Sequence, residues 1–394
     1  MGRNPDPEVY AAYLAEIGHC TLTPPEIRED PPLRYHPQID DYTMSAGMAR
    51  TPGGRIWLTW FGGGDDSRAF MVMAKSDDDG VTWSPPQFVL DPGFYDGIHI
   101  SAVVGNLWTA PDGRLFWFFT LSLGHYDGRG GSWYAVCENP DEDHPRWSRP
   151  VRIWHGASLN KPTVLEDGTW LLPISLWTND VCRVELHMPP LSGLHPELDS
   201  ERKAWIFASN DGGKTWTRRG GVRNIEPTTF DEHMLVERKD GSLLMYLRTV
   251  SGMSRTESFD GGRTWADPVP AEFPSAAARF FFRKLSGGNL LLVRYADPAD
   301  PLNRSHLTAY LSEDEGVTWT GGLLLDERDR ISYPDGFQNE DGRILIQYDR
   351  LREGGEILLC AFTEEDVRAG RDVSGKVFLK RPVIRSRSAG LDPA

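Results

Sequence analysis

The chain has 394 residues, of which 39% are hydrophobic and 25% charged, as is typical of a globular protein. It has no apolar run of about eighteen residues, which excludes a membrane-spanning helix, and its formal net charge of −15 argues against a nucleic-acid partner. The 40 glycines, 29 prolines and 14 tryptophans favour short strands and tight turns over a helical bundle.

Residues 1–35 precede the repeated part of the chain. Asp6 followed by Pro7 predicts the start of a short helix, because Asp caps helices and Pro is tolerated in the first turn. The segment has no apolar core of signal-peptide length, so we expect a cytoplasmic protein. Four cysteines without metal-ligand spacing are expected to be reduced and buried: Cys20, Cys137, Cys182 and Cys360.

One hairpin unit recurs six times across residues 36–380. In each copy an apolar strand runs into a glycine turn and a second apolar strand follows, which is a strong hairpin signal because such turns need positive φ. The six turn glycines are Gly54, Gly113, Gly168, Gly241, Gly288 and Gly342. A spacing of roughly 50 to 60 residues suits a four-stranded propeller blade. The sequence therefore predicts an all-β fold, a single six-bladed β-propeller of four-stranded antiparallel blades, with residues 381–394 as a tail.

A second motif, S-x-D-x-G-x-T-W, occurs four times. Its copies are residues 76–83, 209–216, 258–265 and 312–319. The carboxylate of each aspartate can cap backbone amides of a turn, the glycine takes positive φ, and the tryptophan can pack on the blade. We therefore expect these aspartates to be structural rather than catalytic.

The third repeat is the longest because it carries an insertion, RVELHMPPLSGLHPELDSERKA, at residues 183–204. This segment is predicted to form a surface loop or a subunit contact. The second reading would make the protein a homo-oligomer.

The S-x-D-x-G-x-T-W motifs on a six-unit chain resemble the Asp-box (BNR repeat) sialidase, or neuraminidase, superfamily over roughly residues 35 to 370. The resemblance implies an exo-acting glycoside hydrolase that retains configuration with a tyrosine nucleophile, a glutamate base and an aspartate acid. Such boxes also occur in proteins of other function. Each functional residue therefore has to be carried over separately.

Two stretches carry the nucleophile and its base. DEHMLVERKDGSLLMYLR is similar to the family's strand pair that begins with a glutamate and ends with an arginine, here Glu232 and Arg248. ISYPDGFQNEDGRILIQYDR is similar to the strand that supplies the tyrosine, here Tyr333. Without catalysis, Glu232 and Arg248 would be a rim ion pair and Tyr333 an interblade aromatic residue.

The resemblance also implies a substrate-binding arginine and an acid. Arg304 stands before the last box, as the family's last carboxylate-binding arginine does, and would form a clamp with Arg248. The loop WFGGGDDSRAF places Asp65 and Asp66 where the family keeps its general acid. A solvated turn is the alternative reading of this loop.

The first repeat departs from the family. Met44 stands where an R-I-P motif would place a third arginine, and a thioether offers no donor to a carboxylate. Another cation would have to replace it, and the candidates are Arg68, Lys161, Arg279 and Arg283.

Further polar residues precede the third hairpin or lie in a neighbouring loop. His155, Asn160 and Lys161 are predicted at the channel mouth as a sugar-hydroxyl binding set, or else as turn-capping residues. Asp127 and Arg129 in GHYDGRGG are predicted to line a loop over the site.

Three functional hypotheses remain open. In the first, Tyr333 attacks the anomeric carbon of a terminal, acidic or otherwise polar sugar. In the second, a polysaccharide lyase uses Tyr333, His155 or His233 to abstract a proton beside a uronate. In the third, the propeller binds carbohydrate without catalysis. All three take a carbohydrate partner, and the hydrolase chemistry requires no metal or organic cofactor.

Overall fold

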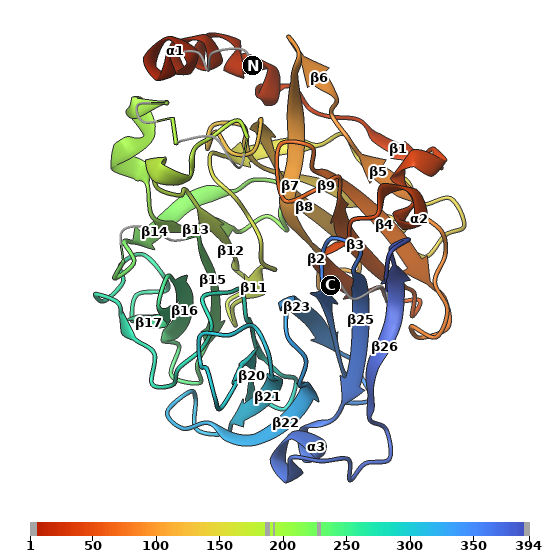
Figure 1. Ribbon diagram of the computed structural model, residues 1–394. Coiled ribbons are helices and arrows are strands. Elements are labelled where there is room, and N and C mark those ends of the chain that lie inside the picture. The colour runs from red at the N-terminus through yellow and green to blue at the C-terminus, as the bar shows by residue number, and fades with distance from the viewer. Residues whose placement is uncertain (1–5, 186–189, 192–193, 227–229, 390–394) are drawn as a thin grey trace.

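Six antiparallel sheets surround a central channel and form a β-propeller (Figure 1). The computed structural model describes residues 6–185, 190–191, 194–226 and 230–389. Each of the six predicted hairpins joins the two innermost strands of one blade, and all six turn glycines have positive φ. The prediction of six four-stranded blades is confirmed.

The blades follow one another in chain order. Blade 1 contains β2 (Met44–Arg50), β3 (Ile56–Gly62), β4 (Phe70–Ser76) and β5 (Phe88–Leu90), and blade 2 contains β7 (Ile98–Thr109), β8 (Leu115–Leu123), β9 (Gly131–Cys137) and β10 (Val151–Trp154), with the short β6 (Phe94–Tyr95) paired to β7. Blade 3 contains β11 (Thr163–Val164), β12 (Trp170–Ser175), β13 (Ala204–Ser209) and β14 (Thr217–Val222). Blade 4 contains β15 (Asp231–Glu237), β16 (Leu243–Thr249), β17 (Gly252–Ser258) and β18 (Val269–Pro270). Blade 5 contains β19 (Phe281–Lys284), β20 (Leu290–Tyr295), β21 (Leu307–Ser312) and β22 (Thr320–Asp326), and blade 6 contains β23 (Ile331–Gln338), β24 (Ile344–Arg350), β25 (Glu356–Phe362) and β26 (Phe378–Arg385).

Both ends of the propeller lie outside the predicted boundaries. The strand β1 (Ile27–Glu29) pairs with β5 as a fifth outer strand of blade 1, so residues before 36 contribute to the sheet. At the other end β26 continues to Arg385, five residues past the predicted end at Lys380. Both are edge strands, and β26 carries the basic residues and the proline that edges tolerate, which conceals the strand pattern in the sequence.

The ring closes through hydrogen bonds between the first and last blades. Ser45 Oγ lies 2.9 Å from the Tyr333 carbonyl oxygen and 2.7 Å from Gln347 Oε1, so its single proton is placed between these two acceptors. The Met48 amide donates to Asp335 Oδ2 at 2.9 Å. Each blade is thus built from its own segment of chain, and side-chain bonds across the seam hold the ring shut.

The S-x-D-x-G-x-T-W boxes act as turn caps, as predicted. In the second box the amide and hydroxyl of Thr215 donate to the Asp211 carboxylate at 3.0 and 2.6 Å, and these bonds lower the pKa of Asp211 to about 2. The Ser209 hydroxyl accepts the Gly213 amide at 2.9 Å. Trp216 packs against a core cluster between blades 2 and 3.

Short helices lie outside the sheets. They are α1 (Pro7–Ile17), α2 (Pro37–Asp40), α3 (Glu364–Ala369) and the 3-10 helices η1 (Gly18–Leu22), η2 (Leu33–Tyr35), η3 (Asn179–Val181) and η4 (Pro196–Glu201). The predicted cap is present, because Asp6 Oδ1 accepts the amides of Glu8 and Val9 at 3.0 and 3.3 Å. Within the part of the chain that the structure describes, no helix combines the length and apolar character needed to cross a membrane.

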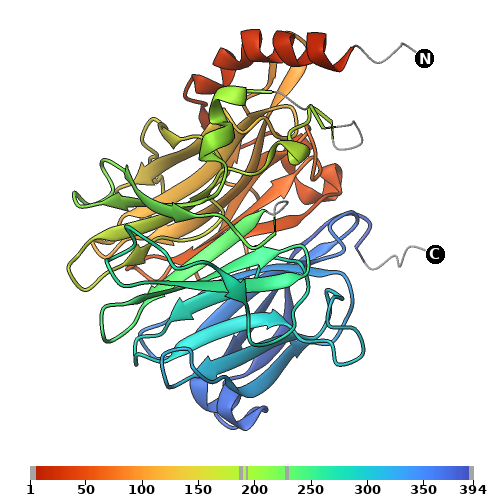
Figure 2. The same cartoon turned by 90° about the vertical axis from the view of Figure 1, so that its left-hand side faces the viewer.

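The insertion of blade 3 lies against the N-terminal helix, and Figure 2 shows α1 crossing this end of the molecule. Leu14 and Ile17 of α1 belong to the same buried cluster as Leu191 and Leu194 of the insertion. Residues 186–189 and 192–193 of the predicted insertion lie outside the described residues. The four cysteines are buried and free, as predicted.

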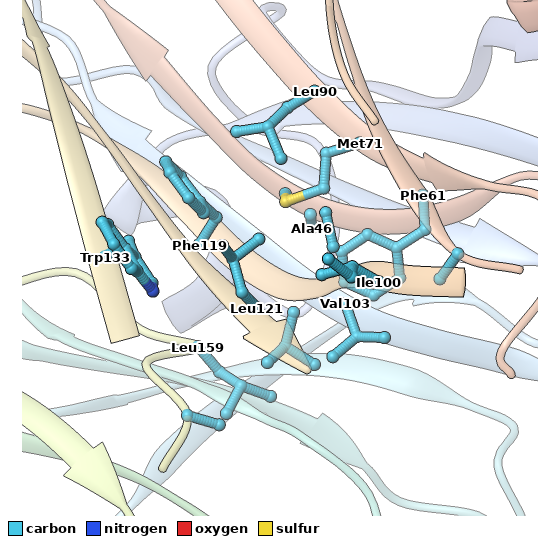
Figure 3. Close-up of a cluster of buried hydrophobic side chains, with 14 of the residues drawn as sticks. Ala46, Phe61, Met71, Leu90, Ile100, Val103, Phe119, Leu121, Trp133 and Leu159 are labelled. Atoms are coloured by element: carbon cyan, nitrogen blue, oxygen red, sulfur yellow. The ribbon is translucent and has the colours of Figure 1, made fainter. Parts of the chain in front are cut away.

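The largest buried cluster lies between blades 1 and 2 (Figure 3). Phe61 and Met71 from blade 1 meet Phe119 and Trp133 from blade 2 in its interior. The same cluster extends to Tyr333 of blade 6. The core of the fold therefore directly supports the site described next.

Candidate active site

Two bulged inner strands bring the predicted nucleophile and base together. The register of β15 shifts between Asp231 and Met234, and that of β23 shifts between Ser332 and Asp335. Glu232 and Tyr333 lie in these bulges with φ of +43° and +55°. Such left-handed residues are costly and concentrate at functional sites.

The contact between the two side chains is direct. Tyr333 Oη donates a hydrogen bond to Glu232 Oε1 at 2.7 Å, although 101 residues separate them in the chain. The Tyr333 amide donates to Tyr295 Oη at 3.0 Å, which holds the backbone of the bulge. The pair is thus fixed from blades 4, 5 and 6.

Burial and charge set the protonation of the tyrosine. Only 8% of Tyr333 is exposed. Burial and the Glu232 carboxylate raise the pKa of Tyr333 to about 12, against the lowering effect of Arg248 and Arg352. At neutral pH the phenol is therefore protonated, and it needs a base to become a nucleophile.

Arg248 lies on the other side of the glutamate. Its Nη1 is 3.0 Å from Glu232 Oε2, and its guanidinium lies 4.8 Å from the centroid of the Phe230 ring. Burial works to lower the pKa of Arg248, but the Glu232 charge outweighs it and raises that pKa. The ion pair between Glu232 and Arg248 considered from the sequence is therefore present, and its glutamate also binds Tyr333.

Arg304 reaches the same end of the channel from blade 5. Its Nη1 donates to Ser332 Oγ at 3.2 Å and its Nη2 donates to the Ala277 carbonyl at 3.0 Å. Ser332 directly precedes Tyr333 on β23. The predicted arginine is therefore next to the predicted nucleophile.

Arg352 is a site residue that the sequence reasoning missed. Its guanidinium lies 4.8 Å from the centroid of the Tyr333 ring, and its Nη1 donates to Asp65 Oδ2 at 2.8 Å. Its Nε lies 3.5 Å from Asp349 Oδ1. Its buried Nη2 has no hydrogen-bond partner among the residues that the structure describes. This arginine follows β24, much as Arg248 ends β16, so the repeat pattern already contained a signal for it.

Arg352 comes close to Met44 of the first blade, because the Thr43 amide donates to the Arg352 carbonyl at 2.9 Å. Met44 is 1% exposed, receives a hydrogen bond from Tyr42 Oη at 3.6 Å, and packs in the cluster that contains Tyr333. Arg352 of blade 6 thus lies beside Tyr333, in the same region as Met44 of blade 1. Of the four replacements considered from the sequence, Arg279 has its guanidinium 5.8 Å from the centroid of the Tyr333 ring, whereas Arg352 contacts both that ring and Asp65.

The two loop aspartates differ in their partners. The Asp66 carboxylate accepts hydrogen bonds from the Arg68 side chain at 2.6 to 3.1 Å. Burial works to raise the pKa of Asp66, but these bonds outweigh it and lower that pKa. Asp65 instead contacts Arg352 and keeps 48% of its side chain exposed. Asp65 therefore contacts the arginine beside Tyr333, while Asp66 and Arg68 form an ion pair with each other.

Three predicted sugar-binding residues form a buried polar network instead. Arg279 Nε donates to Asn160 Oδ1 at 2.8 Å, and Lys161 pairs with Asp335. Asn160 Nδ2 also donates to the Glu232 carbonyl at 2.9 Å. These side chains form their hydrogen bonds and ion pairs with one another because they come together inside the channel. They support the site rather than line its mouth.

The remaining predicted binding residues lie elsewhere. The Asp127 carboxylate accepts the amides of Leu123, Arg129 and Gly130, so it caps its own loop. His155 Nδ1 contacts Arg152 at 3.0 Å beside the outer strand of blade 2. Neither side chain has a hydrogen bond or ion pair with Tyr333 or Glu232 among the described residues, so the predicted role of both in substrate binding stays a prediction.

His233, the other histidine of the lyase hypothesis, is buried against the Trp205 carbonyl at 2.8 Å. Among the described residues there is no group of three or more His, Cys, Asp or Glu side chains suited to holding a metal ion.

Comparison with known proteins identifies the family of the chain. Residues 54–346 match the model of the BNR repeat-like domain. The chain belongs to this family. It is 25% identical over 320 residues to a sialidase of Bacteroides fragilis, covering 77% of this chain and 44% of that protein. It is 36% identical over 102 residues to an anhydrosialidase of Macrobdella decora, covering 26% and 12% of the two chains.

Solved structures share the fold at low sequence identity. The leech intramolecular trans-sialidase in complex with 2,7-anhydro-Neu5Ac has a TM-score of 0.64 at 15% identity, covering 88% of this chain and 71% of that one. The intramolecular trans-sialidase of Ruminococcus gnavus has a TM-score of 0.64 at 14% identity, covering 87% and 98%. The chain spans less than half the length of the two curated relatives named above.

Proposed function

We propose that this protein is an exo-acting, retaining, sialidase-like glycoside hydrolase that releases a terminal acidic sugar. The hydrogen bond of 2.7 Å between Tyr333 Oη and Glu232 Oε1 carries the proposal. A phenol suits attack beside a substrate carboxylate, because a neutral nucleophile is not repelled by that charge. The sialidase relatives support the same reaction class.

In the first step, Tyr333 Oη forms a bond to the anomeric carbon while its proton passes to Glu232. The glycosidic oxygen leaves with a proton from Asp65, which gives a glycosyl-tyrosine and the free alcohol. In the second step Asp65 takes a proton from water, the water oxygen attacks the anomeric carbon, and Tyr333 recovers its proton from Glu232. Atoms and charges balance over the two steps, and configuration is retained.

Asp65 takes the acid role in preference to Asp66. The carboxylate of Asp66 is engaged by Arg68 at 2.6 Å, whereas Asp65 contacts the arginine that covers the tyrosine ring. A half-exposed carboxyl at the channel end can meet a leaving oxygen that points to solvent.

The preference for an acidic sugar follows from three arginines. Arg248, Arg304 and Arg352 approach the tyrosine from blades 4, 5 and 6, and guanidinium groups suit bidentate binding of a carboxylate. The position of Arg352 beside Met44 supplies the third cation that the first blade lacks.

The test is turnover of aryl glycosides of sialic acid, uronic acids and neutral sugars by the wild type and Tyr333→Phe. We expect aryl alcohol release from an acidic glycoside and a fall of at least about a thousandfold in Tyr333→Phe. Activity should be unchanged in the control Tyr134→Phe, which removes a blade 2 hydroxyl that contacts the Lys214 carbonyl of blade 3.

Two outcomes would replace the proposal. If no glycoside released aryl alcohol and ultraviolet absorbance rose with a uronate polymer, the protein would be a lyase. Sugar binding without turnover, unchanged in Tyr333→Phe, would assign a binding propeller.

A further inference from the structure

A cavity opens at the end of the channel opposite Tyr333. It has a volume of about 860 Å³ and is bordered by the β2–β3, β19–β20 and β23–β24 turns, which contain Gly54, Ser286 and Asp341. Inner strands run from the tyrosine end to these hairpins, so the cavity lies on the face opposite Tyr333. It is therefore separate from the candidate active site.

The buried polar network divides the channel between the two ends. Asp335 lies two residues after Tyr333 on β23 and binds Lys161, Arg279 and Asn106. Lys161 also borders the cavity. Lys161 thus forms part of the inner wall of the cavity, and Tyr333 is not among the residues that line it.

The cavity is basic in a chain whose net charge is −15. Five of its lining side chains are basic and two are acidic. Three of the basic groups have carboxylate partners: Arg50 and Arg343 share Asp79, and Lys161 pairs with Asp335. The other two basic groups, Arg283 and Lys284, form no ion pair with a carboxylate within the described residues.

Arg283 is the side chain that most needs a counter-charge. Its Nη2 donates to the Pro162 carbonyl at 2.7 Å, and no other hydrogen bond or ion pair of its guanidinium occurs among the described parts of the chain. Burial lowers the pKa of Arg283 to about 10, with only Asp335 opposing the effect. Arg283 is partly buried and lines the cavity, and its guanidinium N–H groups other than the one on Pro162 can donate to an anion bound there.

We propose that this cavity is a second ligand site that binds a small oxyanion, a phosphate or a sugar carboxylate, with Arg283 as its principal contact. Lys284 lies beside it and has its Nζ on the Glu237 carbonyl at 3.0 Å, which leaves its other N–H groups for the ligand. The site does not depend on the proposed hydrolase activity, because none of its groups touches Tyr333 or Glu232.

The experiment is calorimetric titration of the full chain with inorganic phosphate and, separately, with glucuronate. We expect saturable binding of one of them, weakened at least about tenfold in Arg283→Gln and unchanged in Arg371→Gln, which removes an exposed arginine on the surface. Binding should also persist in Arg304→Gln, which alters the tyrosine end. Phosphate binding alone would identify a phosphate site, and glucuronate binding alone a sugar-acid site.

A second measurement covers the case in which Arg283→Gln does not fold. Crystals of the wild type soaked in selenate should give an anomalous peak within hydrogen-bond distance of the Arg283 guanidinium. Binding that Arg283→Gln leaves unchanged, the lack of saturable binding of both anions, or a cavity without selenate would overturn the proposal. These binding results do not depend on whether Tyr333→Phe loses glycoside turnover, so the two proposals can fail separately.

Discussion

Replacing Arg352 by glutamine is the sharpest test of how this site recognises its substrate. Arg352 lies 4.8 Å from the centroid of the Tyr333 ring and carries a buried Nη2 without a partner among the described residues. If that guanidinium binds the substrate carboxylate, its loss removes one charged hydrogen bond, worth about 1.5–3 kcal/mol. The expected fall in kcat/KM is about tenfold to 150-fold.

The assay compares an acidic aryl glycoside with its methyl ester, which has the same shape but no negative charge. Arg352→Gln should lower kcat/KM for the acid and leave the ratio for the ester nearly unchanged. Adding Met44→Arg to Arg352→Gln should restore part of the activity on the acid, because it returns a cation beside Tyr333 from blade 1.

Stability has to be controlled, because Arg352 also faces the buried Asp349 at 3.5 Å. Losing one partner of a buried pair is destabilising. The double variant Arg352→Gln/Asp349→Asn removes the stranded charge, and its melting temperature and kcat/KM should be measured alongside. Equal losses on acid and ester, or an unchanged kcat/KM on the acid in a folded variant, would refute the role given to Arg352.

Three further predictions concern stability. Burial raises the pKa of Asp349 to about 6, so this carboxyl costs stability as pH rises from about 4 to about 6. The change in melting temperature caused by Asp349→Asn should therefore be more favourable at pH 7 than at pH 4, and an equal change at both would contradict this. Asp211→Ala should lower the melting temperature without changing kcat, because the Asp211 carboxylate caps a turn far from Tyr333. Its pKa of about 2 keeps it ionised except in strong acid. A large loss of kcat would instead show that this motif takes part in catalysis. Burial lowers the pKa of His99, but its bonds to Asp91 at 2.9 Å and to the Ser67 carbonyl outweigh burial and raise that pKa. The advantage of wild type over His99→Gln in urea unfolding should therefore be full below about pH 6.5 and shrink as pH rises further, whereas a constant advantage would exclude the charged pair.

The local parts of the fold were readable from contiguous residues. A hairpin such as that at Gly241 needs only a positive φ between two apolar strands, and a box such as that around Asp211 caps amides within four residues of itself. Turn chemistry of this kind is complete within a short segment, and its repetition set the number of blades. Glu232 and Tyr333 were likewise expected from the resemblance of their sequence stretches to the family's motifs.

The use of each polar side chain was decided only by the tertiary structure. Arg279 and Lys161 looked like binding residues, yet they meet Asn160 and Asp335 from other blades inside the channel and satisfy one another there. Arg352 was overlooked although it follows β24 much as Arg248 ends β16, and its contacts with Tyr333 and Asp65 form only when the ring closes. Partners that lie more than a hundred residues apart leave no local pattern, because their contact exists only once six blades have closed around one channel.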